Sequence, residues 1–166
     1  MAVLGRLWTR LIDGLALLGG ASIGAACLLI AVDVTFRNVG LRPIQASSAL
    51  TEYALLFSTM AGGPWLVREH GHIAVTSFVT MAPDGLRRLI GVLVSLTAVA
   101  TLALLAWRAG VVGLQEAAFG AIDIRSIDIP AWIAYAMLAG GFGLMAVEFL
   151  RLALRAEPPG GSGGAA

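Results

Sequence analysis

His70 and His72 stand two residues apart, directly after Arg68 and Glu69. Imidazole and carboxylate groups at this spacing could bind a metal ion, ligate a haem or relay a proton. A zinc site needs further ligands, and only Glu69 and Asp84 are near in the sequence. A haem between membrane helices needs histidines inside spanning segments, whereas this pair lies in a polar loop. We interpret the stretch as the solvated end of a helix, with partner contact as the alternative, and expect no metal, cofactor or catalytic residue.

Glu52 is a second ionisable residue that could do chemistry, because an apolar segment begins directly after it. An ionisable group placed centrally in the membrane without a partner costs on the order of 2.5 to 3.5 kcal/mol, so it is a candidate functional group. Arg37 and Arg125 are candidate partners for its carboxylate. In the alternative interpretation, Glu52 complements the positive N-terminal end of its own helix near the lipid headgroups. The residues leave both interpretations open.

Three long gaps between charged residues mark the elements that must position these groups. Each gap holds 19 uncharged residues, and they lie between Asp13 and Asp33, Arg88 and Arg108, and Asp128 and Glu148. As a helix, such a gap is about 28 Å long, against a hydrocarbon core of about 30 Å. The pattern therefore predicts three transmembrane helices, and we expect the first to be retained rather than cleaved as a signal peptide.

A fourth apolar segment, residues 53–67, has only 15 uncharged residues. We expect its helix to begin earlier, with Ser47 or Ser48 as the N-cap, and to carry Glu52 in its first turns. The sequence therefore predicts an all-α integral membrane protein with four transmembrane helices in a single domain, residues 1–155. The expected spans are about 14–36, 47–67, 87–108 and 129–150, and a disordered tail is expected over 156–166.

The flanking segments indicate how the helices lie relative to the membrane. Leucines and Trp8 share one face of an amphipathic N-terminal segment, and residues 73–82 are expected to form an interfacial segment between the second and third spans. The two tails and the middle loop carry 7 arginines against 4 in the other two loops. This excess predicts that both termini are cytoplasmic.

Small residues are dense in three of the expected spans, in GGASIG (19–24), AGGP (61–64) and AGGFG (139–143). They favour close packing between helices, and Pro64 is expected to kink the second span. The net charge of +1 argues against a nucleic-acid partner, and the single cysteine, Cys27, excludes an internal disulfide. The lipid bilayer is the partner that the composition requires.

The order of several short motifs is similar to that of a known transporter subunit. The motifs are Arg37-Asn38 after the first span, Glu52 opening the second, AGGP, REHGHIAV, a loop with Pro83, and SIDIPAWIAY before a glycine-rich last span. From about Leu7 to Leu154 the chain resembles the small membrane (DctQ-like) subunit of tripartite ATP-independent periplasmic (TRAP) transporters. Thr51 departs from that pattern, since a tryptophan is common at its position in the family.

The resemblance implies a multi-pass protein of the bacterial inner membrane that is not an enzyme. Its implied partners are a large multi-span permease subunit, which holds the substrate and sodium sites, and a periplasmic substrate-binding protein. The implied cargo is an organic acid of the C4-dicarboxylate or sugar-acid class, taken up by symport, with this subunit as a scaffold. Helix or subunit contacts are expected at Arg37, Glu52, Gly62, Gly63, Pro64, Arg68 and His72. Contacts with the periplasmic partner are expected at Arg42, Asp123, Arg125 and Asp128.

Two alternatives from other classes follow from the same residues. One is a compact four-helix exporter that works as a proton-coupled homodimer through Glu52. The other is a membrane anchor for a redox enzyme, which is disfavoured because neither histidine falls inside a predicted span.

Overall fold

Residues 2–69, 84–124 and 128–154 are described in the computed structural model of the chain. They form four long helices and two short strands: α1 (Ala2–Asn38), α2 (Ser47–Arg68), α4 (Asp84–Phe119), β1 (Ile122–Ile124), β2 (Asp128–Pro130) and α5 (Trp132–Leu154). The expected interfacial segment, the expected tail, both histidines and Arg125 lie outside the described residues.

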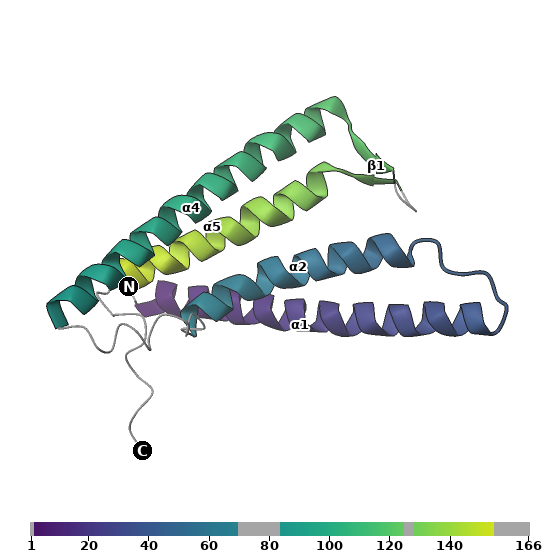
Figure 1. The fold of residues 1–166 in the computed structure, drawn as a ribbon, viewed down its shortest axis with the longest axis horizontal. Helices are drawn as coiled ribbons and strands as arrows, with labels where there is room; N and C mark the ends of the chain where they lie inside the picture. The colour runs from purple at the N-terminus through teal and green to yellow at the C-terminus, as the bar shows by residue number, and fades with distance from the viewer. Residues whose placement is uncertain (1, 70–83, 125–127, 155–166) are drawn as a thin grey trace, which may run out of the picture.

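The helices pair into two hairpins, α1 with α2 and α4 with α5, and α2 packs against α5 to join them. Figure 1 shows the hairpins close together where α1 begins and α2 and α5 end, which we call the terminal end. They diverge toward the α1–α2 loop and the two strands, which we call the loop end (Figure 1). Asp13 and Glu148, which bounded predicted spans, lie toward the terminal end, and Asp33 and Asp128 lie toward the loop end.

Three helices are long and apolar enough to cross a membrane, over Gly5–Asn38, Val92–Phe119 and Trp132–Arg151. The remaining helix of the described part, α2, is not among them. It contains several hydroxyl side chains together with Glu52, Pro64 and Arg68, which lower its hydropathy. The expectation of three apolar spans is thus confirmed for the described residues, while the fourth stays a prediction.

The start of α2 differs from the expected serine cap. Its N-cap is Ala46, which has helical dihedral angles and makes no side-chain capping bond, and Ser47 is the first helical residue. The prediction of Ser47 or Ser48 as N-cap was wrong because the Ser47 hydroxyl is hydrogen-bonded to Asp33 of α1 instead. The helix then continues through Pro64, whose ring is fully buried.

β1 and β2 form an antiparallel two-stranded sheet that the all-α prediction did not include, with Ile122 opposite Pro130 and Ile124 opposite Asp128. Gly120, at a φ of 63°, turns the chain out of α4. A residue that precedes proline is held in an extended conformation, so Pro130 keeps Ile129 in the strand. For this reason α5 begins at Trp132 and not at residue 129, where the last span was expected.

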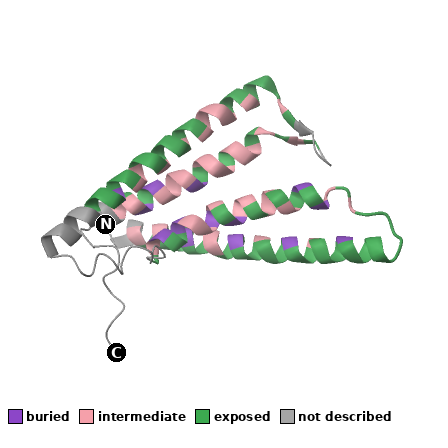
Figure 2. Cartoon of the chain, viewed as in Figure 1, coloured by how far each residue is buried: buried purple, intermediate pink, exposed green. Residues whose placement is uncertain are grey.

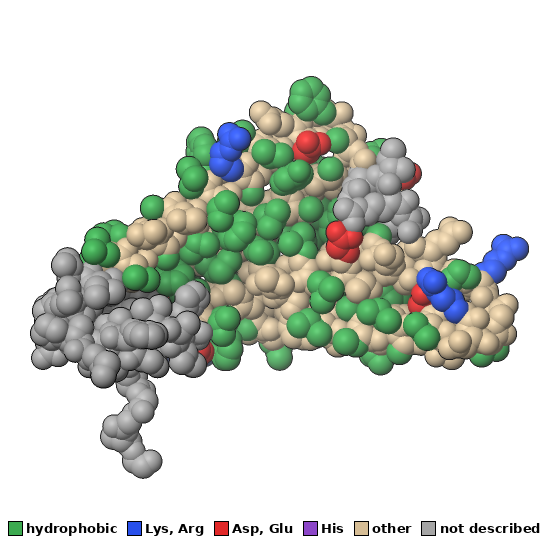
Figure 3. Space-filling view, viewed as in Figure 1, with side chains coloured by type: hydrophobic (Ala, Val, Ile, Leu, Met, Phe, Trp, Pro, Cys, Tyr) green, Lys and Arg blue, Asp and Glu red, His purple; other side chains and the backbone are tan. Residues whose placement is uncertain are grey.

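Burial follows the pattern of a protein that is surrounded by lipid. Large apolar side chains such as Leu17 and Trp107 are 77% and 71% exposed, whereas Asp33 and Glu148 are buried. Figure 2 shows exposed residues along the outer sides of both hairpins, with the buried ones where helices meet. In Figure 3, hydrophobic side chains cover much of the visible face over α4 and α5. Such a surface is stable only against another apolar phase.

Candidate functional site

The α1–α2 contact depends on a glycine and a serine of the GGASIG stretch. A Cβ on Gly19 would lie 3.1 Å from the carbonyl oxygen of Ser58 and 3.4 Å from the Cβ of Ala61. One turn further, the Ser22 hydroxyl donates a hydrogen bond to the carbonyl oxygen of Ala54 at 3.0 Å. The missing side chain of Gly19 lets the two backbones approach closely enough for this bond to form.

The contact between the hairpins is made by two methionines that pack onto two glycines. A Cβ on Gly141 of α5 would lie 2.6 Å from the Cβ of Met60 on α2. In the reverse direction, a Cβ on Gly63 of α2 would lie 2.7 Å from the sulfur of Met145 on α5. This reciprocal packing places Gly63 in a helix contact within the chain, whereas Gly62 faces open space.

The loop end is organised by the carboxylate of Asp33. Its Oδ1 accepts the backbone N–H of Ile44 at 2.7 Å, and its Oδ2 accepts the Arg37 Nε–H at 2.9 Å. The Ser47 hydroxyl supplies a further hydrogen bond. One buried side chain thereby joins the end of α1, the loop and the start of α2. Asp33 and Arg37, which stand four residues apart in α1, also form an ion pair at 2.9 Å.

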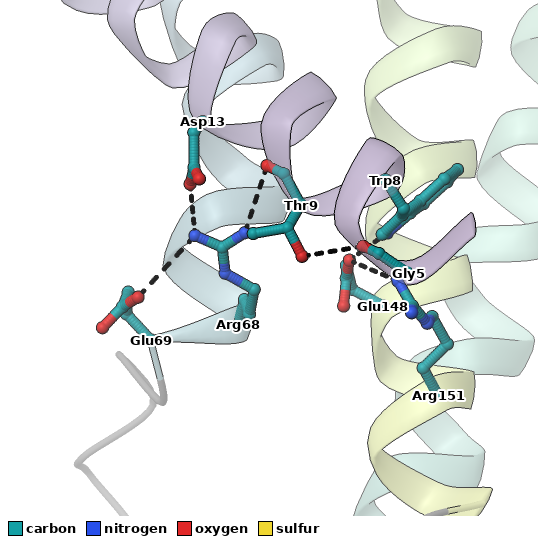
Figure 4. Close-up of polar contacts among 8 residues, drawn as sticks. All are labelled: Gly5, Trp8, Thr9, Asp13, Arg68, Glu69, Glu148 and Arg151. Carbon is teal, nitrogen blue, oxygen red and sulfur yellow. Dashed lines mark hydrogen bonds and ion pairs between the residues drawn. The ribbon is translucent and has the colours of Figure 1, made fainter. Parts of the chain in front are cut away.

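At the terminal end, the first turns of α1 contact both other helices that finish there (Figure 4). The Trp8 indole N–H donates a hydrogen bond to the buried carboxylate of Glu148 on α5. The Arg151 guanidinium lies 3.5 Å from the same carboxylate and 5.5 Å from the centre of the Trp8 ring. On the other side, Arg68 of α2 forms an ion pair with Asp13.

The comparison with protein families decides the identity. The family described as "Tripartite ATP-independent periplasmic transporters, DctQ component" matches residues 26–157. The chain belongs to the DctQ family. This confirms the resemblance seen in the sequence and identifies the chain as a transporter component rather than a member of an enzyme family. No curated protein and no solved structure matches it.

The DctQ match covers α2, α4, the two strands and α5, but it begins at residue 26, within α1. The Gly19 contact, the Ser22 hydrogen bond and the α1 side of the terminal-end cluster therefore precede the matched region. The match lends no support to the exporter alternative, since the family is a component of a different transporter class.

Several residues predicted to contact partners in this DctQ chain bind within the chain itself. Arg37 pairs with Asp33, and Arg68 lies 3.8 Å from Glu69 in addition to its pair with Asp13. Pro64 is fully buried. His72 lies outside the described residues, so its expected contact is untested.

The remaining predicted positions lie toward the loop end. Glu52 is an exposed residue of α2, Arg42 is exposed in the α1–α2 loop, and Asp128 is exposed in β2. The backbone of Asp123 pairs with Ile129 in the sheet. Arg125 is outside the described part. Among the described residues, the predicted contact positions are not brought together into one site.

Sequence reasoning missed the contacts of Trp8, Asp13 and Glu148. The sequence did single out these residues, because Asp13 and Glu148 each border one of the long uncharged gaps and Trp8 lies on the apolar side of its segment. Sequence spacing could not predict that Trp8 and Glu148, which are 140 positions apart, meet at one end of the molecule.

Proposed function

We propose that this chain is the small permease subunit of a TRAP-type, sodium-coupled secondary transporter that imports organic acids of the C4-dicarboxylate or sugar-acid class. The observation that carries the proposal is the DctQ match over residues 26–157. In this proposal the large permease subunit binds substrate and sodium, and a periplasmic binding protein delivers the substrate.

The role proposed for this subunit is that of a rigid scaffold. The described helix contacts support it: glycines against methionines between the hairpins, and a hydroxyl-to-carbonyl bond between α1 and α2. Contacts of this kind hold helix backbones in a fixed relation and leave large apolar side chains facing outward. Those outward faces are available to lipid and to the large subunit.

We further propose that α2 is the fourth span and that the terminal end is cytoplasmic, in the bacterial inner membrane. α2 has 22 residues, about 33 Å of helix, and it packs along α1. The arginine excess in the tails and the middle loop supports this orientation. The loop end then faces the periplasm.

Docking of the binding protein is proposed at the loop end. Arg37 and Arg42 provide exposed cationic groups there, and Asp128 provides an anionic one. Val39 and Leu41, 70% and 55% exposed, add apolar surface between the two arginines. Charges at the rim of an interface mainly raise the association rate and select the partner.

Reconstitution in proteoliposomes tests the proposal. The chain, the large subunit and the binding protein are combined with an inward sodium gradient, and uptake is followed with radiolabelled succinate, malate and a panel of sugar acids. We expect uptake only when all three proteins and sodium are present. Liposomes that contain this chain alone are the decisive control, and organic-acid uptake by them would refute the scaffold role.

A further inference from the structure

The first turns of α1, residues 5–13, form a bridge across the terminal ends of the two hairpins (Figure 4). We propose that this bridge, which we call the N-terminal latch, sets the angle between the hairpins, with Trp8 and Glu148 as its positioning residues. The inference concerns the chain by itself and does not depend on the proposed function.

The connection from the latch to α5 is the stronger of the two. Glu148 is only 4% exposed, and its carboxylate accepts the Trp8 indole N–H while facing the Arg151 guanidinium. Arg151 also lies over the Trp8 ring, where a cation is attracted by the electron density of the ring face. Each of the three side chains contacts the other two, so losing one leaves a buried charged group less well satisfied.

The connection to α2 is made by the guanidinium of Arg68. It pairs with Asp13 and donates a hydrogen bond to the carbonyl oxygen of Thr9 at 3.4 Å. Ile12, which lies between Thr9 and Asp13 in the sequence, is 0% exposed and is one of the two largest fully buried side chains of the described residues. The latch is therefore packed as well as hydrogen-bonded.

The latch lies where the two hairpins converge, so a small rotation there displaces the loop end of the molecule. The hairpins touch mainly through α2 and α5 and diverge toward the loop end (Figure 1). α5 has 23 residues, about 34 Å of helix. A rotation of about 10° at the terminal end therefore moves the loop end of α5 by about 6 Å. Contacts at the point of convergence are best placed to limit that rotation.

The glycine–methionine packing between α2 and α5 fixes how closely these helices approach, at Met60 with Gly141 and at Met145 with Gly63. The latch adds a contact between a different pair of helices, α1 and α5, at Glu148, one turn beyond Met145 toward the terminal end. Contacts of α5 with both α1 and α2 restrict rotation between the hairpins more than contacts with α2 alone. The DctQ match begins at residue 26, so the α1 side of the latch, residues 5–13, precedes the matched region, whereas Arg68, Glu148 and Arg151 lie within it.

Distance measurements between the diverging ends test the proposal. The full chain is placed in lipid nanodiscs with Cys27→Ala, and spin labels are attached at Leu41→Cys and Phe119→Cys, both exposed and on different hairpins. Trp8→Phe keeps an aromatic ring but removes the N–H that Glu148 accepts. We expect Trp8→Phe to broaden the pulsed-EPR distance distribution and shift it relative to the parent protein. Glu148→Gln, which keeps an acceptor but removes the charge, should give a smaller change of the same kind.

Two controls separate a change of angle from a loss of structure. Trp107→Phe makes the same substitution at an exposed residue of α4 and should leave the distribution unchanged. Labels at Leu17→Cys and Leu41→Cys, both on the α1–α2 hairpin, should report the same distance with and without Trp8→Phe. If the distributions between the hairpins superimpose for the parent, Trp8→Phe and Glu148→Gln, the latch does not set the angle and the proposal fails.

Discussion

The carboxylate of Asp33 accepts the backbone N–H of Ile44, eleven residues further along the chain, at 2.7 Å. This bond attaches the backbone of the α1–α2 loop to the end of α1. Because the Arg37 guanidinium that also contacts Asp33 is 61% exposed, solvent screens the ion pair and the bond to the loop backbone matters more.

Substitution of Asp33 tests which of these contacts matters. Asp33→Asn retains an acceptor for the Ile44 N–H and should lower the melting temperature in detergent only slightly. Asp33→Ala removes the acceptor and should lower it clearly more, and should also speed proteolysis of the loop. Equal losses for the two variants would show that charge, and not the loop hydrogen bond, is what stabilises this end.

Gly141, Gly63 and Gly140 form a matched series for the contact between the hairpins. Gly141→Ala forces a Cβ against the Met60 Cβ and backbone, and should destabilise the chain by about 1–3 kcal/mol through overpacking. Gly63→Ala meets only the flexible end of Met145 and should cost less. Gly140→Ala points into open space and should be neutral or stabilising. Unfolding in mixed micelles measures all three, and a neutral Gly141→Ala would contradict the described packing.

The hydroxyl of Ser22 supports a prediction of smaller size. Ser22→Ala removes the hydrogen bond to the Ala54 carbonyl and should cost about 0.6 kcal/mol, the average for interhelical bonds in membranes. Thr59→Ala is the control, because its hydroxyl bonds only the carbonyl of Leu55 in its own helix. The same unfolding assay applies, and a greater loss for Thr59→Ala than for Ser22→Ala would be inconsistent with the α1–α2 contact.

Charge at the loop end is expected to affect transport without affecting stability. Under the proposed function, Arg42→Glu should raise the binding-protein concentration needed for half-maximal uptake, and this effect should fade at high salt. Arg10→Glu, a charge reversal at an exposed residue of α1 that takes part in none of the latch contacts described above, serves as the control. If Arg42→Glu and Arg10→Glu needed the same binding-protein concentration for half-maximal uptake, docking at the loop end would be contradicted.

The helices were predictable because charge is costly inside a bilayer, so the gaps bounded by Asp13, Arg88 and Asp128 had to coincide with buried or lipid-facing helix. The two strands were not predictable from the sequence, since three-residue strands carry little periodicity and depend on the turn at Gly120 and on Pro130. The site was predicted least well. Arg37 and Arg68 were recognised as contact residues, but the pairing of Arg68 with Asp13 depends on the way α1 and α2 pack.

The unequal helices within each hairpin, 37 residues beside 22 in one and 36 beside 23 in the other, have a consequence for the host membrane. The shorter members match an average bilayer, whereas the longer ones exceed it and must tilt or protrude. Because each longer helix is packed along a shorter one, a change in acyl-chain length should tilt each hairpin as a unit and change how far the ends of α1 and α4 protrude. Lipid composition becomes a variable that any reconstitution of this subunit has to control.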